Sequence, residues 1–338
     1  MEDEILKNKN HDRLNWVDQV KGFTIFLVVY GHNFPAIEKY IYSFHMPLFI
    51  MIAGFFHPAA SRFENVGKRF KAIIIPYFIW SFLLFAFWFV ASRHYGDSAA
   101  LNLSPVKNFI GIFYSQGDRQ YMDWGIPLWF LPAIFVTFLL FHFIKKIPNE
   151  NLQYTFVAIV STLGLIYPHL TKINLPWSIN IAMVGLLFYA FGSIVFKKIE
   201  SVSKKQLVIL MIFMGLTNAC LYNLNIKVDM YRAVYGNGLL FVLSAFTGSL
   251  FILFVFKAFP IFKFFELLGK FSLTILALQL VAMTFIKFVL MTASNNTDFN
   301  FSELEKFLYS ILQIILMLPA FFIINKYLPI LNGGYKKI

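Results

Sequence analysis

The sequence predicts an all-α integral membrane protein, a bundle of about ten transmembrane helices with the N- and C-termini in the cytoplasm. Three observations predict this class. Of the 338 residues, 59% are hydrophobic and only 14% are charged, which is too little charge to cover a soluble fold of this size. Runs without Asp, Glu, Lys or Arg recur at the length of about 20 residues that crosses a bilayer as a helix. The basic residues gather between alternate runs, as the positive-inside rule requires.

Ten apolar runs predict the spans, and the polar segments around them predict the domain organisation. The spans are expected at residues 16–34, 41–56, 72–92, 127–144, 152–167, 177–196, 206–224, 237–256, 271–291 and 307–324. A cytoplasmic tail over 1–15 and another over 326–338 would flank a transmembrane domain over 16–325. The first run is one of many and lacks a small-residue cleavage site, so we interpret it as a retained span and not as a signal peptide.

Charge sets the orientation of these spans. With the N-terminus inside, the cytoplasmic segments hold 19 of the 29 basic residues against 8 acidic residues, whereas the outer segments hold 8 of each. This asymmetry supports ten spans independently of hydropathy. It also places most of the net charge of +12 at the cytoplasmic face of the membrane. We therefore expect no nucleic-acid partner. The expected location is a cell membrane, the plasma or inner membrane, with multiple passes.

The basic segment before the third span has two interpretations. It contains Arg62, Lys68, Arg69 and Lys71. In one interpretation these residues only set topology and bind anionic membrane lipid. In the other they receive a polyanionic cytosolic cofactor. Charge alone does not choose between the two.

The first predicted span carries three ionisable residues, Asp18, Lys21 and His32. A charge at the bilayer centre costs roughly 2.5–3.5 kcal/mol, so such residues are functional candidates. Asp18 and Lys21 are i,i+3 neighbours, which form an ion pair on a helix. Lys21 and His32 are eleven residues apart, so they share a face to within about 20°, with His32 about 16 Å further toward the outer side. A polar stripe therefore follows this helix.

His45 lies near the outer end of the second predicted span, at a depth similar to that of His32. Two imidazoles would line one cavity if these spans pack as a hairpin. Structural alternatives remain for several of these residues. Lys21 and Lys287 are close enough to span ends to snorkel, and His45 could simply bond a backbone carbonyl. Trp129 and Trp177 fit an interfacial aromatic belt.

The sequence predicts no disulfide, metal site or phosphate-binding loop. Cys220 is the single cysteine, so it has no intramolecular disulfide partner, and no Cys/His spacing predicts a metal site. No glycine-rich phosphate loop or internal repeat occurs. The longest outer connection, residues 94–126, contains Gly, Pro, Ser and six aromatics and is expected to form a packed cap.

Four segments in order resemble a known family. They are RLNWVDQVKGFTIFLVVYGH (13–32), IYSFHMPLFIMIAGFF (41–56), IPLWFLPAIF (126–135) and LLGKFSLTILALQL (267–280). Together they resemble the membrane-bound acyltransferase-3 family, closest to its fucose 4-O-acetylase-like acetyltransferase branch. The resemblance implies a ten-helix bundle that takes acetyl from cytosolic acetyl-CoA and delivers it to a hydroxyl of a surface polysaccharide or its lipid-linked precursor. Since no Cys/His spacing predicts a metal site, no metal is expected.

The resemblance also implies roles for individual residues. His32 matches the family's essential first-span histidine. Lys21 stands where relatives commonly have arginine, so fork-shaped recognition of a carboxylate or phosphate is lost there. Gln279 stands where many relatives have histidine, and glutamine hydrogen-bonds without titrating.

From these observations we expect His32 and His45 to be catalytic. Donor binding is expected from Asp18, Lys21, Arg62, Lys68 and Arg69, and acceptor binding from Trp129 and Gln279. His32 would act as a general base or as a nucleophile that carries acetyl as an acyl-imidazole.

Two other function classes compete with an enzyme. A transporter or flippase for glycan lipids would use the intramembrane His, Lys and Asp as a translocation path, but the repeated halves common in such folds are not seen in the sequence. A structural factor of a polysaccharide export machine would give no reason for the polar stripe. Stabilisation by CoA would distinguish an acetyltransferase from both.

Overall fold

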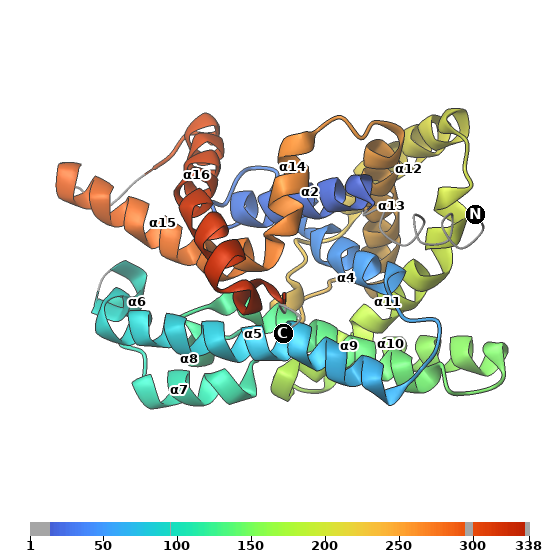
Figure 1. Ribbon diagram of the computed structural model, residues 1–338, viewed down its shortest axis with the longest axis horizontal. Coiled ribbons are helices and arrows are strands. Elements are labelled where there is room, and N and C mark those ends of the chain that lie inside the picture. Colours follow the sequence, from blue (N-terminus) through green and yellow to red (C-terminus); the bar gives the residue numbers. More distant parts are fainter. Residues whose placement is uncertain (1–13, 95, 295–299, 335–338) are drawn as a thin grey trace.

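The computed structural model describes residues 14–94, 96–294 and 300–334, and these residues form helices and no strands (Figure 1). The helices that correspond to the predicted spans are α2 (Asn15–Gly31), α4 (His45–Phe55), α5 (Phe63–Val90), α9 (Phe130–Ile144), α10 (Glu150–Leu170), α11 (Ile179–Glu200), α12 (Lys204–Leu224), α13 (Gly238–Ala258), α15 (Ser272–Ser294) and α16 (Glu303–Tyr327). Shorter helices connect them: α3 (Glu38–Tyr42), α6 (Gly96–Ala100), α7 (Pro105–Tyr114), α8 (Arg119–Met122) and α14 (Lys263–Lys270). The predicted all-α class is confirmed.

Seven of the described helices are long and apolar enough to cross a membrane: α5, α9, α11, α12, α13, α15 and α16. The span of α5 includes the short 3₁₀ turn that follows it, and those of α9 and α11 include the 3₁₀ turns that precede them. The other three predicted spans fall on α2, α4 and α10. At 1.5 Å per residue, the 11 residues of α4 cover only about 16 Å, which is about half of the hydrocarbon core. The crossing number of ten and the orientation of the termini therefore stay predictions. Residues 1–13 of the predicted N-terminal tail and residues 335–338 of the predicted C-terminal tail lie outside the described residues.

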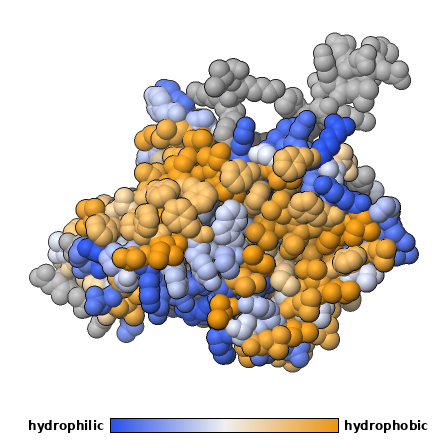
Figure 2. Space-filling view, turned by 90° about the horizontal axis from the view of Figure 1, so that it is seen from below, coloured by the Kyte–Doolittle hydropathy of each residue, from blue (hydrophilic) through white to orange (hydrophobic). Residues whose placement is uncertain are grey.

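Apolar side chains cover much of the outer surface. In Figure 2 hydrophobic residues dominate the face that is shown, and hydrophilic residues gather in separate patches. Helix α12 is the clearest case, because its most apolar 18-residue window is only 11% buried inside the protein. Exposed Ile209, Phe213 and Leu216 lie on it. Such a surface requires lipid as its solvent, so the protein is a multi-pass membrane protein.

Helix α5 begins earlier than predicted. Its first residue is Phe63, nine residues before the expected start at residue 72. Lys68, Arg69 and Lys71, which were expected in a connecting segment, therefore lie in its first turns. Hydropathy changes only at residue 72, whereas lysine and arginine are good helix formers, so the helix extends past the apolar run.

Helix α14 packs backbone-to-backbone against α2, although some 240 residues separate them in sequence (Figure 1). A Cβ atom built on Gly22 would lie 1.7 Å from the carbonyl oxygen of Phe265, and one built on Gly269 would lie 1.9 Å from that of Asp18. Only glycine allows this approach. The contact fixes the half of α2 that carries Asp18 and Lys21.

The connection over residues 94–126 is folded, as predicted for a packed cap. Asn108, which is fully buried, hydrogen-bonds to three residues of the segment 120–124. Its side-chain amide donates to the Gln120 carbonyl (3.0 Å), its side-chain oxygen accepts from the Asp123 backbone N–H (2.9 Å), and its backbone carbonyl accepts from Trp124 Nε1 (2.9 Å). A buried amide bonded in this way holds the cap in one conformation.

Candidate functional site

His32 ends helix α2. Phe34 has a positive φ of 53° and Pro35 cannot donate a backbone hydrogen bond, so the helix stops here. The imidazole is partly exposed, and its Nδ1 lies 2.7 Å from the Val28 carbonyl oxygen. Because a carbonyl only accepts hydrogen bonds, Nδ1 must carry the proton, and Nε2 of the neutral ring keeps its lone pair. The backbone thus selects the tautomer that can take up a proton at Nε2.

His45 repeats this arrangement at the start of α4. Its Nδ1 lies 2.9 Å from the Ile41 carbonyl oxygen, so Nδ1 donates and Nε2 again keeps its lone pair. The residue is 5% exposed, and its ring centroid lies 5.0 Å from that of Tyr42. His32 is close enough for its charge to act on His45, and the buried Gln279 of α15 lies next to His32. We call His32, Tyr42, His45 and Gln279 the histidine cluster.

A group of charged side chains borders the histidine cluster. Lys227 Nζ lies 2.9 Å from Glu38 Oε2 and 5.4 Å from the centroid of the Tyr42 ring. Asp229, on the same connection as Lys227, also interacts electrostatically with Tyr42. Burial raises the pKa of Asp229 to about 6, although Arg232 and Lys227 favour its charged form. These groups lead from the imidazoles toward the connection between α12 and α13.

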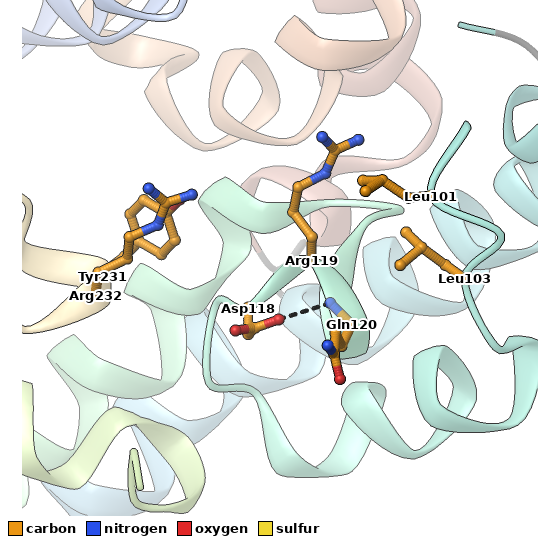
Figure 3. Close-up of a pocket in the computed structure, with 7 residues that line it drawn as sticks. All are labelled: Leu101, Leu103, Asp118, Arg119, Gln120, Tyr231 and Arg232. Atoms are coloured by element: carbon orange, nitrogen blue, oxygen red, sulfur yellow. Dashed lines mark hydrogen bonds between the residues drawn. The ribbon is translucent and has the colours of Figure 1, made fainter. Parts of the chain in front are cut away.

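A pocket of about 300 Å³ opens beside this charged group (Figure 3). Its lining comes from the cap and from the α12–α13 connection, and consists of Leu101, Leu103, Asp118, Arg119, Gln120, Tyr231 and Arg232. Arg119 Nε donates to Asp123 (2.8 Å), and the Gln120 backbone N–H donates to Asp118 Oδ1 (2.7 Å). We call this the cap pocket; its Tyr231 is near enough to Tyr42 of the histidine cluster to interact with it electrostatically.

None of the predicted site residues lines the cap pocket, but Trp129 supports it from behind. Trp129 is 5% exposed and therefore packs inside the protein, and its alternative place in an interfacial aromatic belt stays a prediction. Gly117, with φ of 75°, lies between it and Tyr231: a Cβ atom at Gly117 would lie 3.1 Å from the Tyr231 ring and 3.4 Å from Trp129 Cβ. Trp129 therefore positions the loop that forms one wall of the pocket. The cap residues were missed because they follow no periodic pattern.

The predicted donor-binding residues lie in two places. The Asp18–Lys21 ion pair is present, with Lys21 Nζ 3.4 Å from Asp18 Oδ1, and it lies against α14. Arg69 is partly buried, donates to the Ala53 carbonyl (3.4 Å) and lies over the Phe138 ring at 5.5 Å. Two other basic residues, Arg62 and Lys68, are exposed nearby in sequence.

The part of the chain that the structure describes contains no group of three His, Cys, Asp or Glu residues arranged to hold a metal ion. The two histidines of the histidine cluster lie with a tyrosine and a glutamine, which suits acid–base chemistry and hydrogen bonding.

Comparison with known proteins gives one family and one partial relative. Residues 14–326 match the acyltransferase domain described as Acyl_transf_3. The chain is also similar to nodulation protein NolL of Sinorhizobium fredii (strain NBRC 101917 / NGR234), with 29% identity over 140 residues, 36% of this chain and 34% of the relative. The chain thus aligns with about a third of that relative's length. No solved structure matches.

Proposed function

The chain belongs to the acyltransferase domain family and is a membrane acyltransferase, and from this premise we propose that it moves an acetyl group from cytosolic acetyl-CoA to a saccharide hydroxyl. The acceptor is a surface polysaccharide or its lipid-linked precursor, as in the fucose 4-O-acetylase-like branch. The enzyme works in the plasma or inner membrane of the cell.

The observation that carries this proposal is the tautomer of His32. The acceptor oxygen attacks the thioester carbonyl carbon while His32 Nε2 takes the hydroxyl proton. The C–S bond of the tetrahedral intermediate then breaks, and the sulfur leaves as CoA thiol after receiving that proton, which regenerates the neutral imidazole. A general base of this kind contributes roughly 10²–10⁴-fold to the rate. The Val28 carbonyl stabilises the imidazolium that forms, because it still accepts from Nδ1.

The two histidines of the histidine cluster have different proposed roles. His32 is partly exposed and can reach the acceptor, whereas His45 is buried against Tyr42. His45 orients the hydroxyl by accepting its hydrogen bond or stabilises the oxyanion by donating one after protonation. Gln279 lies next to His32, and its amide donates to the Leu276 carbonyl (3.4 Å), so it offers the site a polar group that does not titrate.

The cap pocket supports a saccharide acceptor. Its volume of about 300 Å³ is at the lower limit of small-ligand sites. Tyr231, Leu101 and Leu103 offer apolar and aromatic surface for the ring face of a sugar. Asp118 and Gln120 offer polar groups for its hydroxyls. A sugar in this pocket would contact Tyr231, which interacts electrostatically with Tyr42 of the histidine cluster.

The donor approaches from the opposite end of α4. Helix α4 is about 16 Å long, with His45 at its first residue and Ala53, whose carbonyl accepts from Arg69, in its last turn. The long pantetheine arm of CoA likewise separates its thioester from its phosphates. Asp18 and Lys21 lie partway along α2, and Arg62, Lys68 and Arg69 lie at the start of α5. The proposed donor path therefore runs from these basic residues to the histidine cluster.

The function is tested with cells that lack this gene and with the same cells after complementation. Mass spectrometry of their surface polysaccharide is expected to show a loss of one acetyl unit per repeat, restored by the wild-type gene. Purified protein should transfer label from radioactive acetyl-CoA to that polysaccharide. Unchanged acetylation in the deletion cells, together with no transfer by the purified protein, would refute the proposal.

A further inference from the structure

A second group of titratable side chains lies at the other end of α4. His57 follows this helix by two residues, and its Nδ1 lies 3.1 Å from the hydroxyl of Tyr189 on α11. The ring of His142, on the last turn of α9, lies 6.2 Å from that of His57 between centroids. Arg69 of α5 and Lys145 are near enough to His57 for their positive charges to interact with its imidazole. We call His57, Arg69, His142, Lys145 and Tyr189 the basic cluster, and four helices converge on it.

Three imidazole nitrogens of the basic cluster are buried without a hydrogen-bond partner in the described part of the chain. They are His57 Nε2, His142 Nδ1 and His142 Nε2. His142 is fully buried. A buried polar group left unbonded costs roughly 1–3 kcal/mol, so such groups in proteins require an explanation, for example a bound water or ion. Whichever tautomer His142 adopts, one of its nitrogens is a donor without an acceptor.

The cluster also carries positive charge without a protein counterion. Arg69 contacts the Ala53 carbonyl and the Phe138 ring, and Lys145 Nζ donates to Gln153 Oε1 at 3.0 Å. Neither pairs with a carboxylate among residues 14–94, 96–294 and 300–334. Burial, and then the charges of His142, Arg69 and Lys145, lower the pKa of His57 to about 4. An anion at this place would reverse the effect of those charges.

We propose that the basic cluster binds a phosphate group of the CoA donor, and that the His57–His142 pair takes up a proton from solvent when the phosphate binds. This inference rests on the proposed function and names the residues that recognise the donor. A phosphate oxygen beside the two rings accepts hydrogen bonds from the nitrogens that now lack partners. The guanidinium of Arg69 and the ammonium of Lys145 supply charge, and the Tyr189 hydroxyl holds His57 in place through Nδ1.

The test uses purified full-length protein in uncharged detergent, with CoA as the probe and calorimetry as the readout. His57→Asn keeps a group at the Nδ1 position for Tyr189 and removes the Nε2 group, and His142→Gln removes the buried ring. His169→Gln, at an exposed site on α10, is the matched control. At pH 6.0 each cluster variant should bind CoA at least tenfold more weakly than wild type, whereas the control should equal it. Pantetheine, which has no phosphate, should bind all four proteins equally.

Proton uptake provides a second measurement that needs no variant. Titration of wild type with dephospho-CoA, whose remaining phosphates do not titrate near pH 6, in buffers of different ionisation enthalpy should show net uptake of protons. Binding without proton uptake would overturn the inference, and so would CoA affinities within twofold of wild type in both folded cluster variants. If these variants bind phosphatidylglycerol more weakly but bind CoA as wild type does, the basic cluster is a lipid-binding site and the inference also fails. Wild type that binds no CoA at all would instead refute the proposed function.

Discussion

Replacing Gly22 with alanine tests the contact that fixes α2 against α14. The new methyl group would lie 1.7 Å from the Phe265 carbonyl oxygen, whereas ordinary contact begins near 3.4 Å, so α14 must move away by about half of that contact distance. Overpacking of this kind costs roughly 1–3 kcal/mol, and the obstacle here is backbone, which cannot rotate aside. We expect Gly22→Ala to lower the free energy of unfolding by about 2–3 kcal/mol despite the better helix propensity of alanine.

Gly67→Ala is the matched control, because Gly67 also lies in a helix but a Cβ atom there meets nothing within 4 Å. It should be neutral or stabilising by about 0.5–1 kcal/mol. Thermal unfolding in detergent, followed by circular dichroism, measures both variants. Gly22→Ala should lower Tm by roughly 4–10 °C. Equal Tm values for the two variants would refute the backbone contact between α2 and α14.

Three further predictions concern the groups between the cap pocket and the histidines. Asp229 has its pKa raised by burial from 3.8 to about 6, so its contribution to stability is fully present below pH 3.8 and is lost as pH rises through 6. When the pH falls from 7 to 4.5, the free energy of unfolding of wild type should therefore rise by about 2 kcal/mol relative to that of Asp229→Asn, which denaturation at both pH values would measure. The same pH dependence of stability in the two proteins would contradict this. Leu103→Trp should fill the cap pocket and raise the acceptor KM at least tenfold without changing CoA affinity, and an unchanged KM would exclude the pocket as the acceptor site. His45→Asn keeps a donor for the Ile41 carbonyl and should lower kcat by roughly 10-fold or more at unchanged Tm, whereas a wild-type kcat would leave His45 without a chemical role.

The helices could be predicted from the sequence because hydropathy and helix length are local properties. Each expected span overlaps a helix, and the cap is folded as expected. Hydropathy does not report where charged residues continue a helix, so the early start of α5 at Phe63 was missed. Helix α14 was missed for a related reason: its eight residues are too few to cross a bilayer, and its place against α2 depends on a glycine contact between distant segments.

Part of the site followed from helix geometry. The i,i+3 ion pair of Asp18 with Lys21 is present, and so is the alternative for His45 in which its ring bonds a backbone carbonyl, that of Ile41. This bond does not exclude a role in catalysis, because it leaves Nε2 unprotonated.

The cap pocket could not be predicted, because Asp118 and Tyr231 meet across more than a hundred residues in irregular connections. The basic cluster was also beyond prediction. Only Arg69 among its members was a candidate, since His57 and His142 look like isolated polar residues until four helices bring them together.

The central claim is that His32 removes the acceptor proton through Nε2, and the variant His32→Asn tests it most directly. Asparagine keeps an N–H donor for the Val28 carbonyl and has no basic nitrogen, so fold and CoA affinity should equal wild type. The rate of acetyl transfer from acetyl-CoA to the polysaccharide should fall by roughly 10²–10⁴-fold. A folded His32→Asn protein that still transfers acetyl within threefold of the wild-type rate would contradict the account.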